Sequence, residues 1–252
     1  MTIVPLSEGS FTIDHTKAFV PFNKATDDLQ QRPTGSLLVE IQPFAVITSK
    51  DIIILDCGLG FSDNSDVLQI HKNLVDHDID PMLVTKVLLT HLHKDHAGGI
   101  SKHDKQLHQR FLSFPNATYY VHEKELAFAS QKQNASYFPE QFETLKYSDR
   151  LVLLKEETGV IDGYIDYELT SAHSAFHQVF WIRENNQTLF FGGDDAPQHQ
   201  QMKSRFVAKY DFDGKKASAL RRMWWERGQT EGWTFLFYHD IQTPVVSFEK
   251  QQ

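Results

Sequence analysis

Residues 91–96 read His91-Leu92-His93-Lys94-Asp95-His96 and directly follow a short apolar run, Val87-Leu88-Leu89-Thr90. The run predicts a buried strand that ends in a loop of four metal-type side chains. Alternate residues of an extended chain point the same way, so the first two histidines can bind one ion. Asp95 and His96 follow the strand, where the turning backbone can direct them to another ion. Each zinc-like ion needs only three or four imidazole or carboxylate ligands, so this loop predicts two metals.

Length and charge limit the kind of protein and its partners. A chain of 252 residues can bury a substantial core, and no linker-like stretch divides it, so we expect one domain over residues 1–252. Acidic residues outnumber basic ones by 33 to 25, for a formal charge of −8. This balance argues against nucleic acid as a partner, because a phosphate-binding face needs basic side chains.

Cysteine usage and apolar runs indicate the compartment. Cys57 is the only cysteine, which excludes an intrachain disulfide framework and leaves a nucleophilic thiol as a minor alternative. No run approaches the roughly 18 apolar residues of a membrane span. Residues 1–10 lack the basic start and apolar segment of a secretory signal, so we expect a cytoplasmic protein with no membrane partner. A homodimer is one of the assemblies that the sequence allows.

Apolar patterning predicts a mixture of strands and helices. Residues 10–13, 36–41, 44–48 and 52–55 are expected to form an antiparallel meander. Further strands are predicted over residues 118–121, 151–154, 163–170, 177–183, 188–191, 233–238 and 245–248, and helices over residues 66–75, 122–131, 140–146 and 215–227. The predicted strands and helices are mixed in two similar halves of the chain. This arrangement predicts sheets packed together with helices outside them.

Three further metal-type side chains follow predicted strands. They are His173, Asp194 and His239, each placed just after an apolar segment. Loops at strand ends gather catalytic groups because the sheet fixes where each loop begins. We therefore expect these three residues to join the 91–96 loop.

These residues resemble the metallo-β-lactamase superfamily over nearly the whole chain. The family signature H-x-H-x-D-H is complete in residues 91–96, and Gly98 and Gly99 match its following glycines. Asp56 and Gly58 occupy the family's Asp-Thr-Gly turn, with Cys57 replacing threonine. The resemblance implies an α+β protein with a four-layer αββα sandwich of two mixed β-sheets.

The resemblance also implies a ligand for each position of a two-metal site. One ion would be held by His91, His93 and His173, and the other by Asp95, His96 and His239, with Asp194 bridging. Asp195 is the competing choice for the bridging aspartate. The family segment Gly-His-Ser/Thr-Pro-Gly-His is altered here to Ala172-His173-Ser174-Ala175-Phe176-His177, in which we expect His177 to pack or orient other groups.

Zinc is the expected metal, with manganese, iron and cobalt as alternatives. The implied reaction is hydrolysis, in which a hydroxide bridging the two ions attacks a carbonyl or phosphoryl centre. Asp95 and Asp194 are the expected catalytic carboxylates, since they hold the metals at the reacting centre. Asp194, Asp195 and His199 are the candidates for protonating the leaving group.

Several segments resemble the branch that contains N-acyl homoserine lactonases and methyl parathion hydrolase-like enzymes. They are Phe114-Pro115-Asn116-Ala117, His122-Glu123-Lys124-Glu125 and Asp211-Phe212-Asp213. The branch implies cleavage of a lactone or a carboxylic ester. Pro197 stands where lactonases often carry a tyrosine, which weakens the lactone assignment.

Other functions remain as alternatives. A phosphotriesterase or a thioesterase would use the same fold, and a metal-stabilised binding or sensor protein would retain the ligands without turnover. Phe19, Pro21 and Phe22 form an apolar group that can cover the pocket, favouring a small-molecule substrate with an apolar acyl or aryl group. Pinning of this loop to the core is the equal alternative. Trp224 and Trp225 are expected to pack a helix onto the core.

Overall fold

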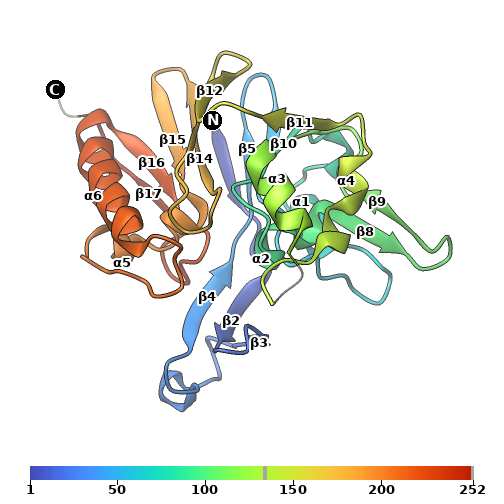
Figure 1. The fold of residues 1–252 in the computed structure, drawn as a ribbon, viewed down its shortest axis with the longest axis horizontal. Coiled ribbons are helices and arrows are strands. Elements are labelled where there is room, and N and C mark those ends of the chain that lie inside the picture. The colour runs from blue at the N-terminus through green and yellow to red at the C-terminus, as the bar shows by residue number, and fades with distance from the viewer. Residues whose placement is uncertain (133–134, 251–252) are drawn as a thin grey trace.

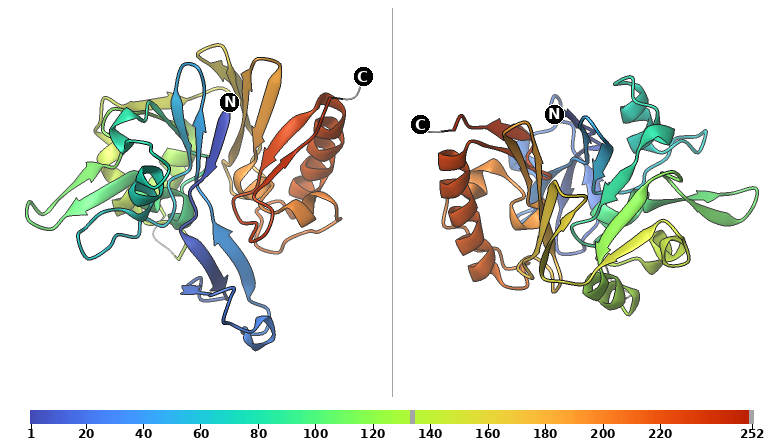
Figure 2. Two further views of the ribbon diagram at one scale, coloured as in Figure 1. Left: turned by 180° about the vertical axis from the view of Figure 1, so that it is seen from behind. Right: turned by 90° about the horizontal axis from the view of Figure 1, so that it is seen from above.

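Two six-stranded mixed sheets face each other and carry helices on their outer sides, as Figures 1 and 2 show from three directions. The computed structural model describes residues 1–132 and 135–250. The predicted α+β class and the αββα sandwich are confirmed. Among the described residues, no helix is both long and apolar enough to cross a lipid bilayer.

The first sheet delivers the 91–96 loop. Its strands β6, β7, β10 and β11 run parallel to one another, and β5 and β1 add antiparallel neighbours at one edge. Parallel strands buried on both faces favour continuous β-branched runs such as Ile52-Ile53-Ile54. In spatial order the strands are β1 (Thr2–Pro5), β5 (Phe44–Ile47), β6 (Ile52–Leu55), β7 (Lys86–Leu88), β10 (Thr118–His122) and β11 (Leu151–Leu154).

The second sheet is antiparallel except where β15 and β16 pair in parallel. A parallel pair needs a crossover connection, and α6 (Gly214–Glu231) lies within the one between β15 and β16. In spatial order the strands are β12 (Thr158–Ile161), β13 (Ile165–Leu169), β14 (Gln178–Glu184), β15 (Gln187–Phe191), β16 (Trp233–Leu236) and β17 (Val245–Ser247).

Three apolar cores hold the four layers together. The central core lies between the sheets and includes Phe44, Phe180 and Phe191. One outer core packs α1 (Gln69–Val75), α3 (Glu123–Ser130) and α4 (Glu143–Lys146) against the first sheet. The other packs α6 against the second sheet through Trp224 and Trp225, which confirms the packing role predicted for this pair.

A three-stranded arm projects from the sandwich at the lower side of Figure 1. It consists of β3 (Phe19–Pro21), β2 (Gly9–Ile13) and β4 (Leu37–Ile41), in that spatial order. The predicted single meander is therefore wrong, because β4 pairs with β2 while β5 and β6 belong to the first sheet. The chain changes sheets at Gln42-Pro43, and β1 pairs with β5 in place of β4.

Several short elements complete the fold. The polar stretch after Gly99 forms an unpredicted hairpin of β8 (Ser101–Asp104) and β9 (Gln109–Leu112). Two short helices are α2 (Lys94–Ala97) and α5 (His199–Met202). The 3-10 helices are η1 (Leu29–Gln31), η2 (Pro81–Leu83), η3 (Gly98–Ile100), η4 (Pro139–Gln141) and η5 (Gly193–Asp195).

The two glycines after the 91–96 loop allow a close backbone approach. A Cβ atom on Gly99 would lie 2.1 Å from the carbonyl oxygen of Cys57, and one on Gly98 would lie 2.2 Å from that of Leu59. The N–H of Cys57 also donates to the carbonyl of His96 at 2.7 Å. The loop after β6 thus packs directly against the end of the ligand loop.

We expect Gly99→Ala to lower the free energy of unfolding by about 2–3 kcal/mol, since overpacking forces the backbone apart. Urea denaturation measures the difference. Gly35→Ala is the control, because Gly35 has φ +80° but a Cβ atom there would meet no other atom within 4 Å. That variant should lose only about 1–2 kcal/mol from backbone strain. Equal losses in the two variants would contradict the close-packing argument.

Glu8 also contacts the loop that follows β6. Its Oε2 accepts a hydrogen bond from the N–H of Leu59 at 2.6 Å, while its Oε1 is buried with no hydrogen-bond partner among the described residues. Burial raises the pKa of Glu8 to about 8, although hydrogen bonds from Leu59 and Gly60 oppose the shift. The folded protein therefore retains a proton on this carboxyl at neutral pH.

Glu8 should make stability depend on pH. The unfolded chain loses this proton near pH 4.5 and the folded chain near pH 8, so the stabilisation is complete below 4.5 and is lost as pH rises to 8. Glu8→Gln, which cannot ionise, should gain stability relative to the wild type between pH 5 and 8 in urea denaturation. The exposed Glu143→Gln variant should follow the wild type, and a Glu8→Gln curve parallel to the wild type would refute the assignment.

Candidate metal centre

Strand ends of both sheets meet at one buried cluster of imidazoles and carboxylates. The 91–96 loop follows β7, and α2, which contains Asp95 and His96, lies at the root of the arm in Figure 1. The second sheet contributes His173 after β13, Asp194 in η5 after β15, and His239 after β16. The structure thus brings together all seven residues that the sequence analysis selected.

The first group consists of three histidines. The Nδ1 of His93 lies 2.9 Å from the Nε2 of His91 and 3.3 Å from the Nε2 of His173. The Nε2 of His173 is 3.1 Å from the Oδ2 of Asp194. Three ring nitrogens and one carboxylate oxygen therefore face a common point.

The second group lies beside the first. Asp95 places its Oδ2 3.7 Å from the Nε2 of His96 and 3.6 Å from the Nε2 of His239. The Oδ1 of Asp194 lies 3.1 Å from the Nε2 of His96 and 2.9 Å from that of His239. Asp194 thus directs one oxygen to each group, as a bridging ligand would.

The donor set fits two divalent ions. Ligands about 2 Å from a tetrahedral ion lie about 3–3.5 Å from one another, which is the spacing of most of these atoms. The Nε2 of His96 and the Oδ1 of Asp194 are buried and face each other, yet they have no hydrogen-bond partner among the described residues. A metal ion would satisfy both atoms.

Outer hydrogen bonds fix which nitrogen each ring presents. Nδ1–H of His96 donates to Asp56 at 2.8 Å, that of His173 to Asp211 at 2.9 Å, and that of His239 to the carbonyl of Glu40 at 2.8 Å. Each of these rings therefore turns the lone pair of Nε2 towards the cluster. Such contacts orient metal-binding histidines and increase their basicity.

Sequence reasoning missed two of these outer partners. Asp211 stands out in the sequence only as part of a branch-like segment, and the carbonyl of Glu40 carries no sequence signal at all. Spacing along the chain could not pair Asp211 with His173, since the loop 203–213 joins α5 to α6 without a regular pattern. Asp56, expected only in a family turn, also accepts the hydroxyl hydrogen bond of Thr90 at 2.7 Å.

Charge within the cluster determines its protonation. Burial lowers the pKa of His91 and His93 well below the usual value, which keeps both rings neutral. Burial acts against the charged form of Asp194, yet its neighbouring histidines hold the pKa of Asp194 well below its usual value. Burial also opposes the charged forms of His96, His173 and His239, but nearby carboxylates, Asp194 first, raise their pKa.

The competing candidates lie outside the cluster or support it. Asp195 is fully buried, accepts the N–H of His173 at 2.7 Å and lies 3.1 Å from Nδ1 of His177. The Nε2 of His177 accepts the N–H of Asp194 at 3.2 Å, in agreement with its predicted orienting role. His199 packs against Trp225 and Phe237, away from the cluster. Neither Asp195 nor His199 is placed to protonate a leaving group.

Cys57 also lies apart from the reacting region. Its side chain is fully buried, and burial, followed by the neighbouring charge of Asp56, raises the pKa of the thiol well above its usual value. A thiolate nucleophile is therefore excluded at this position.

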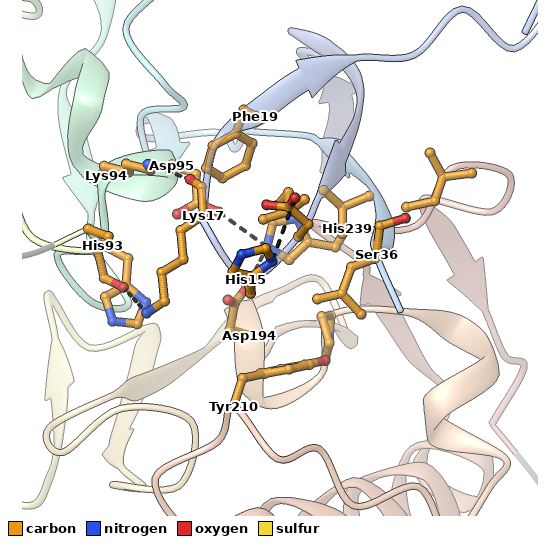
Figure 3. Close-up of a pocket in the computed structure, with 18 of the residues that line it drawn as sticks. His15, Lys17, Phe19, Ser36, His93, Lys94, Asp95, Asp194, Tyr210 and His239 are labelled. Carbon is orange, nitrogen blue, oxygen red and sulfur yellow. Dashed lines mark hydrogen bonds and ion pairs between the residues drawn. The ribbon is translucent and has the colours of Figure 1, made fainter. Parts of the chain in front are cut away.

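A cavity of about 690 Å³ opens over the cluster, and Figure 3 shows its lining. Its floor includes His93, Asp95, His173, Asp194 and His239. The arm forms one wall, and the opposite wall includes Pro197, Gln201 and Tyr210. Phe19 lines the cavity as expected, whereas Pro21 and Phe22 are not among its lining residues and belong to β3 and the segment after it.

Comparison with known proteins identifies the family. Residues 41–194, more than half of the chain, match the family model of the metallo-beta-lactamase superfamily. The chain belongs to this superfamily. A search of curated protein sequences finds no match.

Solved structures share the fold at low sequence identity. A probable metal-dependent hydrolase from Staphylococcus aureus is 20% identical with a TM-score of 0.77, covering 98% of this chain and 91% of the other. The hydrolase AbOPH of the beta lactamase superfamily is 23% identical with a TM-score of 0.73, covering 99% and 90%. AidC, a dizinc quorum-quenching lactonase, is 19% identical with a TM-score of 0.69, also covering 99% and 90%.

The contact between His173 and Asp211 can be tested through metal affinity. Asp211→Asn should weaken binding of one zinc ion by about 10-fold to 100-fold, since outer partners of metal-binding histidines have effects of this size. Competition with a chromophoric chelator measures both affinities. Asp166→Asn, in an exposed pair with Arg183, should leave them unchanged. Unchanged zinc affinity in Asp211→Asn would show that this contact does not support a ligand.

Proposed function

We propose that this protein is a binuclear metal-dependent hydrolase that cleaves a lactone or a carboxylic ester. The observation that carries the proposal is Asp194, whose two oxygens face two separate ligand groups at the floor of the cavity. His91, His93 and His173 would hold one ion, and Asp95, His96 and His239 the other. Zinc suits this mixture of imidazole and carboxylate, and manganese, iron and cobalt also accept it.

The bound ions would supply an activated water at neutral pH and polarise the scissile carbonyl. The chain's own residues determine the geometry in which this happens. Asp194 and Asp95 set the negative charge of the centre, and the hydroxyl of Tyr238 donates to the carbonyl of Asp95 at 2.6 Å. Tyr238 also stacks on His96, with ring centroids 4.1 Å apart, which holds this ligand in place.

The walls of the cavity support a substrate with an apolar part. Ile13 and the segment Leu37-Leu38-Val39 line the arm side, and Phe19 lies with them. An acyl chain or an aryl group buried there would gain about 25 cal/mol for each Å² of apolar surface removed from water. AidC has been solved in complex with the product N-hexanoyl-L-homoserine, a small molecule with an apolar acyl chain.

The proposal predicts turnover and a metal count. Protein loaded with zinc should bind two ions per chain and hydrolyse at least one member of a panel of lactones, aryl esters, phosphotriesters and thioesters. Lactones or esters should be the best substrates. Asp95→Ala should reduce kcat at least about 100-fold, as expected when a group that organises transition-state charge is removed. Metal analysis and initial rates measure these quantities.

Asp104→Ala, on the β8–β9 hairpin away from the cavity, is the matched control and should retain activity. A best rate on phosphotriesters or thioesters would replace the ester assignment while retaining the hydrolase. Two bound metals with no turnover on the whole panel would instead support a binding or sensor protein.

A further inference from the structure

The cavity over the metal centre has a positively charged side that the proposed ester hydrolysis does not use. Lys17, Arg32 and Lys94 all line it, although the chain as a whole carries a net charge of −8. Lys17 and Arg32 come from the arm, and Lys94 comes from the ligand loop itself. Positive charge is thus gathered beside the cluster from two separate parts of the fold.

The carboxylates that line the cavity are not in ion-pair contact with these cations. Asp95 and Asp194 face the two ligand groups, and Asp14 accepts hydrogen bonds from its own turn at Thr16. Among the described residues, none of Lys17, Arg32 and Lys94 forms an ion pair with a carboxylate, whereas Lys24 of the same arm pairs with Glu40 at 3.3 Å. These three cations therefore lack a carboxylate in ion-pair contact, although the charge of Asp95 favours the protonated form of Lys94.

The ammonium groups of Lys17 and Lys94 are held in place. Lys94 donates to the carbonyl of Lys17 at 2.7 Å and lies over the rings of Phe19 and Phe138, at 5.2 and 5.4 Å from their centroids. Lys17 donates to the hydroxyl of Ser136 at 2.5 Å. Figure 3 shows the side chain of Lys17 reaching down towards His93. A positive charge fixed next to a metal ligand is preorganised to receive an anion.

We propose that the substrate carries an anionic oxygen group, a carboxylate or a phosphate, close to its scissile bond, and that Lys17 binds this group. The inference rests on the proposed hydrolase function and narrows its substrate class. The apolar part of the substrate would lie along Leu37-Leu38-Val39, and its anionic group would lie on the Lys17 side of the metal centre. Arg32 and Lys94 would add to the positive potential that attracts it.

The test uses substrates that differ only in charge. Three esters with one acyl chain would carry a carboxylate, a phosphate or a neutral carboxamide near the scissile bond, and kcat/KM is measured for each with the zinc-loaded protein. Dissociation constants for the corresponding non-hydrolysable amides are measured by calorimetry. We expect at least one anionic compound to be favoured about 10-fold to 100-fold over the neutral one, the size expected for a charged hydrogen bond. The identity of the favoured anion shows whether the substrate's anionic group is a carboxylate or a phosphate.

Variants of Lys17 and its neighbours distinguish an effect of the lysine charge from a structural role of its side chain. Lys17→Gln should abolish the preference by weakening only the anionic compounds, while Lys17→Arg should retain it. Ser136→Ala removes the hydrogen-bond partner but not the ammonium, so the preference should persist. Lys50→Gln, a lysine over the ring of Tyr164 outside the cavity, is the matched control and should behave as the wild type.

Two results would overturn the inference. One is equal binding of anionic and neutral compounds by the wild type. The other is an equal loss of affinity for both kinds of compound in Lys17→Gln, as expected if Lys17 only holds the arm in place through Ser136. Neither result touches the hydrolase proposal, which fails only if no compound of the substrate panel is cleaved. Because the amides report binding without turnover, the charge preference is decided even in that case.

Discussion

A buried carboxylate surrounded by histidines is the constraint on which this structure depends. Asp194 lies among ring nitrogens of His96, His173 and His239 at 2.9–3.1 Å, and a buried charge of this kind is costly unless opposite charges or metal ions compensate it. Its partners come from both sheets. The two sheets must therefore pack so that the loops at their strand ends lie side by side. The central core, which includes Phe44, Phe180 and Phe191, fixes this arrangement.

The arm is connected to the centre through Glu40 at the end of β4. The backbone carbonyl of Glu40 receives Nδ1–H of His239, while its side chain receives hydroxyl hydrogen bonds from Ser7 and Ser10 and pairs with Lys24. One residue thus joins a proposed metal ligand to the wall of the cavity. This contact couples the position of the proposed ligand His239 to the shape of the cavity wall.

Local sequence signals predicted the elements better than their pairing. Runs such as Ile52–Leu55 and Leu151–Leu154 appear as strands at the predicted positions because their apolar residues are contiguous. The meander failed because residues 2–5, which gave little local signal, compete for the edge of β5 and displace β4. The β8–β9 hairpin was missed because, apart from the buried Ser101, its residues alternate between half-buried and exposed and form no continuous apolar face.

The sequence by itself determined which side chains form the centre. The H-x-H-x-D-H spacing and the strand-end positions of His173, Asp194 and His239 identify ligand types, because ligand chemistry resides in side chains and strand periodicity directs them. Only the tertiary structure decided that Asp194 rather than Asp195 faces both groups, that Asp211 orients His173, and that Lys17 lies beside His93. The choice of Asp194 depends on the turn of η5, and Asp211 and His173 are 38 positions apart in the chain. No local sequence pattern encodes where such distant loops meet.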